Sequence, residues 1–102
     1  MFFVAVAETE VIGTAMAGYD GHRGWLYALA VHPQWRRSGI GSRLVHHAEE
    51  ALAQFGCMKI NLQLLASNKS TTTFYESLGY AVEPRVSMGK VLHNNAPDKH
   101  ED

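Results

Sequence analysis

The stretch VHPQWRRSGIGSRL, residues Val31 to Leu44, joins an apolar run to a helical pattern and decides the fold. The run before it, Trp25 to Val31, is apolar at nearly every position, which predicts a strand buried on both faces. Pro33 ends that strand because proline has no amide hydrogen for a neighbouring strand. From Ser42 onward apolar residues recur at helical spacing, and Gly56 is a typical helix stop, so this segment predicts a helix.

The segments on either side complete a small α/β domain. Besides Trp25 to Val31, the predicted strands are Phe2 to Ala7, Val11 to Tyr19, Met58 to Leu65, Tyr80 to Glu83 and Val86 to Leu92. The first two predict an antiparallel hairpin, whereas the helix returns the chain so that Met58 to Leu65 runs parallel to Trp25 to Val31. A second short helix is expected from about Ser70 to Leu78. The sequence thus predicts an α/β (α+β) fold: a mixed, mostly antiparallel sheet with one parallel strand pair and helices packed on it.

The composition limits the number of domains and the kinds of partner. With 102 residues, 46% of them hydrophobic, and a net charge of −1, the chain fits one domain over residues 1–92 and a polar tail over residues 93–102 that we expect to be disordered. The charge balance is too even for a protein that binds nucleic acid. No apolar run reaches the ~20 residues of a membrane span, and the opening MFFVAVAETE has no basic n-region. We therefore expect a cytoplasmic protein without a membrane or nucleic-acid partner.

No metal site is expected. Cys57 is the single cysteine, which excludes an internal disulfide and a two-cysteine metal site, and favours a core residue at a helix end over a reactive thiol. His46 and His47 are neighbours on the predicted helix and diverge by about 100°, so they are poorly placed to share one ion.

The glycine-containing loop predicts an anion site. The first backbone N–H groups of a helix have no intrahelical partner, and the helix dipole adds partial positive charge there. Gly39 and Gly41 let the backbone approach a phosphate, and three arginines lie close by. A P-loop is excluded because Ser42-Arg43 stand where it needs lysine and then serine or threonine, and Leu44 stands where a dinucleotide loop needs glycine or alanine. An ordinary solvated turn remains the alternative.

Two ordered motifs resemble those of the GNAT superfamily of N-acetyltransferases. Arg36-x-x-Gly39-x-Gly41, after a strand ending in Val31-His32-Pro33, resembles the family's acetyl-CoA loop. Asn68 followed by Phe74-Tyr75-Glu76-x-Leu78-Gly79-Tyr80 looks like its N-x-x-A-x-x-x-Y-x-x-x-G-F segment, with Thr71 for alanine and Tyr80 for phenylalanine. The resemblance covers about residues 1–92 and is nearest to the small bacterial branch around the ribosomal-protein alanine acetyltransferases.

This resemblance implies roles for particular residues. Loop amides would bind the pyrophosphate of acetyl-CoA, and backbone groups of the preceding strand, which splays from its parallel neighbour, would pair with pantetheine. Tyr75 would protonate the CoA thiolate as the amine attacks the thioester directly; a core aromatic beside Phe74 is the alternative. Asn68 would cap its helix or bond the cofactor arm. The implied cofactor-binding residues are Leu29, Val31, Arg36, Arg37, Ser38, Gly39, Ile40, Gly41, Ser42 and Asn68.

The acceptor half of the site is less complete in the sequence. The strand Trp25 to Val31 has no carboxylate to serve as a base, so Tyr27, His22, Glu8 or a water molecule stay open as candidates. The family's domain begins with a strand and two helices before the point where this sequence starts, so we expect an N-terminally shortened fold. Its uncovered apolar surface predicts a homodimer.

The expected function is transfer of an acetyl group from acetyl-CoA to a primary amine, either of a small molecule or of a protein N-terminus. The alternatives are a CoA-binding module without turnover and a structural domain with a vestigial loop.

Overall fold

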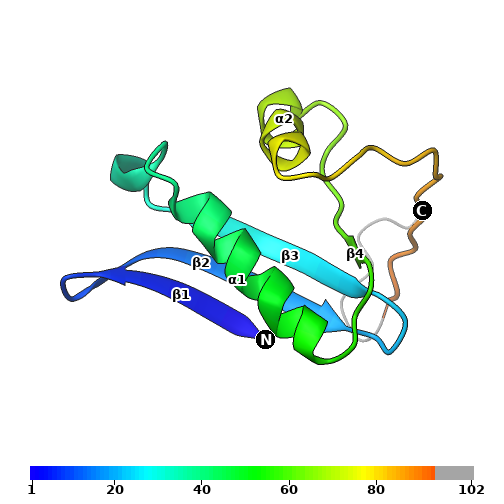
Figure 1. The fold of residues 1–102 in the computed structure, drawn as a ribbon. Coiled ribbons are helices and arrows are strands. Elements are labelled where there is room, and N and C mark those ends of the chain that lie inside the picture. The colour runs from blue at the N-terminus through cyan, green and yellow to red at the C-terminus, as the bar shows by residue number, and fades with distance from the viewer. Residues whose placement is uncertain (94–102) are drawn as a thin grey trace.

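A computed structural model describes residues 1–93 as a four-stranded sheet with two helices (Figure 1). The elements in chain order are β1 (Phe2–Ala7), β2 (Glu10–Tyr19), β3 (Gly24–Val31), the short 3-10 helix η1 (Pro33–Trp35), α1 (Ile40–Gln54), β4 (Ile60–Asn61) and α2 (Lys69–Ser77). The strand order is β1-β2-β3-β4, with the first two pairs antiparallel and the last parallel. The predicted mixed, mostly antiparallel α/β fold is confirmed.

The core lies between α1 and one face of the sheet (Figure 1). The apolar stripe of α1 consists of Leu44, Val45, Ala48 and Leu52, all buried. At the far end of the helix, a Cβ on Gly24 would lie 2.9 Å from both Leu52 Cδ1 and Cys57 Sγ. The helix thus approaches β3 closely because Gly24 has no side chain, and Cys57 lies half-buried against the core.

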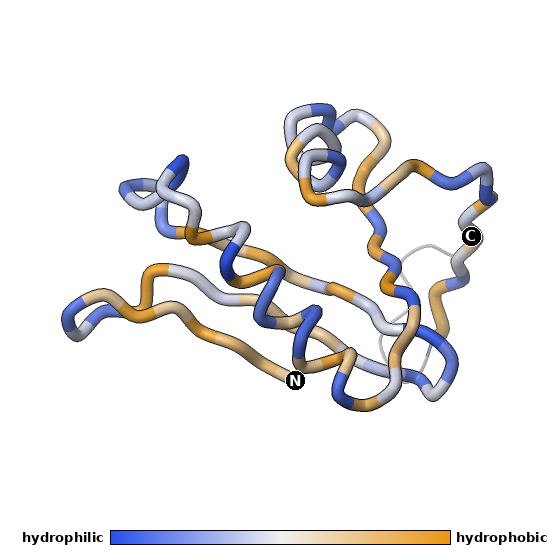
Figure 2. Tube along the Cα trace, in the orientation of Figure 1, coloured by the Kyte–Doolittle hydropathy of each residue, from blue (hydrophilic) through white to orange (hydrophobic). Residues whose placement is uncertain are grey.

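The prediction that the third strand is buried on both faces is wrong. Tyr27 of β3 is 64% exposed, and Ala28 and Ala30 are exposed as well. The reason is that α1 covers one face only. Figure 2 shows that β1 is apolar along its length, although only alternate residues of it point toward α1.

The strand predicted over Met58 to Leu65 is paired over two residues only. β3 bonds β4 at Gly24↔Ile60 and Trp25↔Asn61 and nowhere beyond. After Asn61 the chain leaves the sheet toward α2 (Figure 1). Within residues 1–93, the second half of β3 therefore has a free outer edge.

The final strand pair predicted over Tyr80 to Glu83 and Val86 to Leu92 is also wrong. This segment has no regular structure and contacts the β4 region through side chains. Lys59 Nζ lies 2.6 Å from Glu83 Oε2, Asn61 Nδ2 donates to Glu83 Oε1 at 3.0 Å, and Gln63 Nε2 donates to Ser87 Oγ at 3.0 Å. Pro84 removes one amide donor from the segment, which disfavours a continuous ladder.

Two further findings concern membrane-spanning helices and the C-terminal tail. Among residues 1–93 no helix is long and apolar enough to cross a bilayer. The predicted disordered tail falls almost entirely on residues 94–102, which lie outside the described residues.

Candidate functional site

The loop before α1 leaves the first amides of the helix open. Gly39 is the N-cap in the left-handed region, with φ 86°, and no side chain caps the helix. The first intrahelical bond runs from Arg43 N–H to Gly39 C=O at 3.1 Å. In the described part of the chain the N–H groups of Ile40, Gly41 and Ser42 therefore have no partner, which is the arrangement of an anion site.

Positive side chains surround these amides. Arg36, Arg37 and Arg43 are all exposed, and the first turn of α1 carries no acidic residue. Arg37 also has a positive φ of 65°, so the loop turns sharply twice before the helix. Ser38 is used within the loop, because its hydroxyl donates to the carbonyl of Trp35.

Gly41 is the point where the two sequence motifs meet. A Cβ on Gly41 would lie 3.3 Å from Phe74 Cζ of α2 and 3.8 Å from Val31 Cγ2 at the end of β3. The absence of a side chain lets these three elements converge. The anion loop therefore lies directly beside the helix that carries Tyr75.

The free edge of β3 presents the backbone groups of Leu29 and Val31. The N–H of His32 donates to Ile12 C=O on β2 at 2.7 Å. Because backbone groups of successive strand residues point to opposite edges, those of Val31 and Leu29 point away from β2. Arg36 Nε donates to the Val31 carbonyl at 3.2 Å, which is consistent with this direction. An extended chain bearing amide groups could pair with this edge.

Asn68 fixes the start of α2. Its side-chain oxygen accepts the N–H of Thr71 at 3.3 Å, so Asn68 is the N-cap of the helix. Thr72 Oγ1 donates to the Asn68 carbonyl at 2.9 Å. Of the two roles open to Asn68, capping is the one that the structure contains.

Tyr75 is the buried residue of α2. It is 6% exposed and its ring lies between Phe74, at 5.0 Å and 72°, and Tyr80, at 5.6 Å and 78°. Among residues 1–93 no protein group is hydrogen-bonded to its hydroxyl. Burial raises the pKa of Tyr75, so the hydroxyl keeps its proton well into alkaline solution. A buried hydroxyl without a partner points to a ligand or water as its partner.

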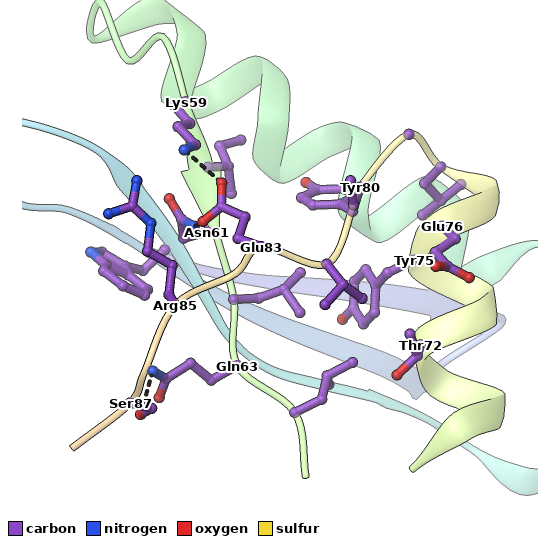
Figure 3. Close-up of a pocket in the computed structure, with 18 of the residues that line it drawn as sticks. Lys59, Asn61, Gln63, Thr72, Tyr75, Glu76, Tyr80, Glu83, Arg85 and Ser87 are labelled. Atoms are coloured by element: carbon purple, nitrogen blue, oxygen red, sulfur yellow. Dashed lines mark hydrogen bonds and ion pairs between the residues drawn. The ribbon is translucent and has the colours of Figure 1, made fainter. Parts of the chain in front are cut away.

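Tyr75 borders an open cleft of about 1270 Å³ between α2, the β4 region and the C-terminal segment. On the β3 side it adjoins an apolar gap beside Leu26, Ala28 and Leu29 that is too small to hold a water molecule. Figure 3 shows the rings of Tyr75 and Tyr80 pointing from the α2 side toward the strand that carries Asn61. Tyr75 thus lies next to the half of β3 whose outer edge is free.

The candidate bases are not brought to this point. Glu8 lies in the turn between β1 and β2, and His22 in the turn between β2 and β3, at opposite ends of the sheet (Figure 1). The hydroxyl of Tyr27 lies 3.0 Å from the Cβ position of Gly18. No hydrogen bond among the described residues joins any of the three to Tyr75. Residues 1–93 also contain no group of three metal-ligating side chains.

Sequence reasoning missed a second pair of residues at the cleft. Tyr80 Oη donates to Glu49 Oε2 of α1 at 2.7 Å. Burial raises the pKa of Tyr80 most, and this hydrogen bond and the charge of the Glu49 carboxylate raise it further. The sequence marks Tyr80 only as a substitute for phenylalanine and does not single out Glu49, because a contact between residues 31 apart leaves no local pattern.

Comparison with known proteins gives one family. The family model described as "Acetyltransferase (GNAT) family" matches residues 1–80. A similar solved structure is the aminoglycoside 6'-N-acetyltransferase AAC(6')-IG from Acinetobacter haemolyticus, with 25% identity, a TM-score of 0.72, and coverage of 88% of this chain and 69% of that one.

Two other solved structures share the fold at lower identity. AAC(6')-Iy in complex with the bisubstrate analog CoA-S-monomethyl-acetylneamine has 21% identity and a TM-score of 0.79, over 90% of this chain and 69% of that one. The PaiA N-acetyltransferase from Thermoplasma acidophilum, in complex with coenzyme A, has 24% identity and a TM-score of 0.79, over 84% of this chain and 54% of that one. With its matching family model, its fold and both of its motifs, the chain belongs to the acetyltransferase (GNAT) family.

Proposed function

We propose that the protein transfers an acetyl group from acetyl-CoA to a primary amine in the cytoplasm. The observation that carries the proposal is the convergence, at Gly41, of open helix amides, the free edge of β3 and the helix that bears Tyr75, whose hydroxyl has no partner among residues 1–93. The pyrophosphate of CoA would meet the amides, its pantetheine arm would meet the edge of β3, and its sulfur would meet Tyr75. The three features lie in the same order as these three parts of CoA.

The loop would hold the pyrophosphate. The N–H groups of Ile40, Gly41 and Ser42 each donate one charge-assisted hydrogen bond, worth about 1.5 to 3 kcal/mol. Arg37 and Arg43 add positive charge at the surface. Ser38 contributes through the loop shape, because its hydroxyl is committed to Trp35.

The free edge of β3 would hold the pantetheine arm. Backbone groups of Leu29 and Val31 pair with its amides as an added strand does. Arg36 already donates to the Val31 carbonyl, but a carbonyl oxygen has two lone pairs and accepts a second donor. The terminal nitrogens of Arg36 stay available for phosphate.

Tyr75 would act as the general acid. Acetyl-CoA supplies an activated thioester; the amine nitrogen bonds to its carbonyl carbon, and the carbon–sulfur bond breaks. Tyr75 donates its hydroxyl proton to the departing sulfur and regains one from solvent, while the amine loses its own proton to solvent. The raised pKa of Tyr75 keeps the acid in its protonated form at neutral pH.

The acceptor would be a primary amine of a small molecule or of a protein N-terminus. Two of the similar structures are named as aminoglycoside acetyltransferases, which supports a small polyamine as the first class to test. A homodimer is part of the proposal. Phe2, Val4 and Val6 of β1 share the face away from α1 with Met16 and Val11, and all five are at least 43% exposed. Such a face favours self-association.

The test is release of free CoA thiol from acetyl-CoA with a panel of aminoglycosides, polyamines and short peptides. A chromogenic disulfide reports the thiol, and a blank without amine corrects for Cys57, which is half-buried. We expect release that depends on both substrates, with the acetylated amine seen by mass spectrometry. Binding of acetyl-CoA without release for any amine would instead establish the second candidate, a CoA-binding module. That candidate is favoured by the positions of Glu8 and His22, which lie away from Tyr75.

A further inference from the structure

One side-chain hydrogen bond ties α1 to the chain after α2. Tyr80 Oη donates to Glu49 Oε2 at 2.7 Å, and both groups are partly buried. Among the described residues no other side-chain hydrogen bond joins α1 to residues beyond Gln54. A bond from a hydroxyl to a carboxylate is short and strong compared with a bond between neutral groups. Its loss would therefore release Tyr80 from α1.

Tyr80 is in turn coupled to Tyr75 in two ways. The N–H of Tyr80 donates to the Tyr75 carbonyl at 3.1 Å, in a helix end where Gly79 has φ 99°. The Tyr80 ring lies edge-on to the Tyr75 ring, 5.6 Å between centroids. The ring of Tyr80 thus forms one wall of the Tyr75 site, and Phe74 forms the other.

Among residues 1–93 no hydrogen bond fixes the hydroxyl of Tyr75. Only packing holds its ring, and α2 is a helix of nine residues, too short to be stable without tertiary contacts. A general acid must lie within hydrogen-bond reach of the atom that it protonates. The position of the Tyr75 hydroxyl therefore depends on the walls beside it.

We infer that Tyr80, anchored by Glu49, is a positioning residue that holds the Tyr75 hydroxyl where it can protonate the leaving sulfur. This inference rests on the proposed function. Tyr80 does not touch the reacting atoms; it acts through Tyr75. The same contact explains why a tyrosine is useful at residue 80, since phenylalanine would keep the ring wall and lose the anchor.

The test is a double-mutant cycle on turnover with saturating amine. Tyr80→Phe should lower kcat by about 10- to 100-fold and leave the KM for acetyl-CoA unchanged, because the ring wall can then shift by a fraction of an ångström. Glu49→Ala should lower kcat by the same factor, whereas Glu49→Gln, whose amide oxygen still accepts the hydrogen bond, should keep most of the activity. In a Tyr75→Phe background, Tyr80→Phe should lower kcat no further.

The matched control is Ser87→Ala, which removes another long-range side-chain hydrogen bond of the same segment and should leave kcat unchanged. Thermal unfolding of each variant excludes loss of fold. Glu49→Ala, read against Glu49→Gln, tests the same hydrogen bond if Tyr80→Phe does not fold. If the wild type is active but Tyr80→Phe does not change its kcat, the inference is wrong while the proposed function stands. The same holds if Tyr80→Phe lowers kcat by the same factor in the Tyr75→Phe background as in the wild type. A wild type that binds acetyl-CoA without turnover overturns the proposed function, and this inference with it.

Discussion

Replacing Tyr75 by phenylalanine should raise stability and lower activity at the same time. The Tyr75 side chain is 6% exposed, and its hydroxyl has no hydrogen-bond partner among residues 1–93. Burying such a group costs roughly 1 to 3 kcal/mol. Since Tyr75 borders the open cleft, water reaches part of it, so we expect the lower end of that range. Phenylalanine keeps the ring contacts with Phe74 and Tyr80 and removes the hydroxyl.

The expected gain of about 1 kcal/mol corresponds to a rise in Tm of about 4 to 8 °C for a domain of this size. The turnover number should fall by about 10² to 10⁴, the usual contribution of a general acid. Thermal unfolding and thiol release on the same preparations measure both quantities. Tyr19→Phe is the stability control, because this tyrosine is 37% exposed.

Two results would refute this reasoning. A Tyr75→Phe variant that is less stable by about 1 kcal/mol or more, the usual net contribution of one hydrogen bond, would mean that the hydroxyl has a structural partner. A variant with unchanged turnover would mean that Tyr75 is a core aromatic, the alternative left open by the sequence.

Three other perturbations separate the site from the scaffold. Gly41→Glu places a carboxylate on the open amides of α1, so it should abolish the thermal shift with acetyl-CoA. Its Cβ would lie 3.3 Å from Phe74 Cζ, so the apo protein should also lose about 1 to 3 kcal/mol. Gln54→Glu, at the other end of α1, should keep the shift. Leu52→Ala empties a fully buried site and should cost about 2 to 5 kcal/mol in denaturant unfolding, with a cost near zero contradicting the packing of α1. The backbone N–H groups of Arg23 and His22 lower the pKa of Asp20 from 3.8 to about 2. The ionised carboxylate therefore stabilises the fold fully above pH 3.8, and this stabilisation is lost as the pH falls through 2. Asp20→Asn should flatten the dependence of Tm on acid pH, and an unchanged dependence would contradict this prediction.

The helices and the first three strands could be predicted because their signals are local. The helical spacing of apolar residues in α1 and the N-cap at Asn68 can be recognised within a few neighbouring residues. Accordingly, α2 begins and ends within one residue of its predicted bounds. The turn at Gly39 also has a local cause, the need for a positive φ. The two motifs then met in space because Gly41 lets α1, α2 and β3 converge.

The remaining features depend on contacts that sequence patterns do not record. Alternating residues over Met58 to Leu65 predict a strand, but whether it pairs depends on where its neighbour runs, and β3 diverges after two pairs. The segment after Tyr80 has strand-like composition, yet Glu83 is held by the side chains of Lys59 and Asn61. The hydrogen bond between Glu49 and Tyr80 likewise could not be predicted, because it joins residues 31 apart in the sequence.

The most direct measurement is an amide NMR titration of the chain with acetyl-CoA. The account predicts that the largest shifts fall on the amides of Gly39, Ile40, Gly41 and Ser42, and that the amides of Leu29 and Val31 become protected from hydrogen exchange. NAD at the same concentration should produce neither effect at β3. Shifts confined to the cleft around Lys59 and Glu83, or the same pattern with NAD, would contradict the claim that the loop and the free edge of β3 form an acetyl-CoA site.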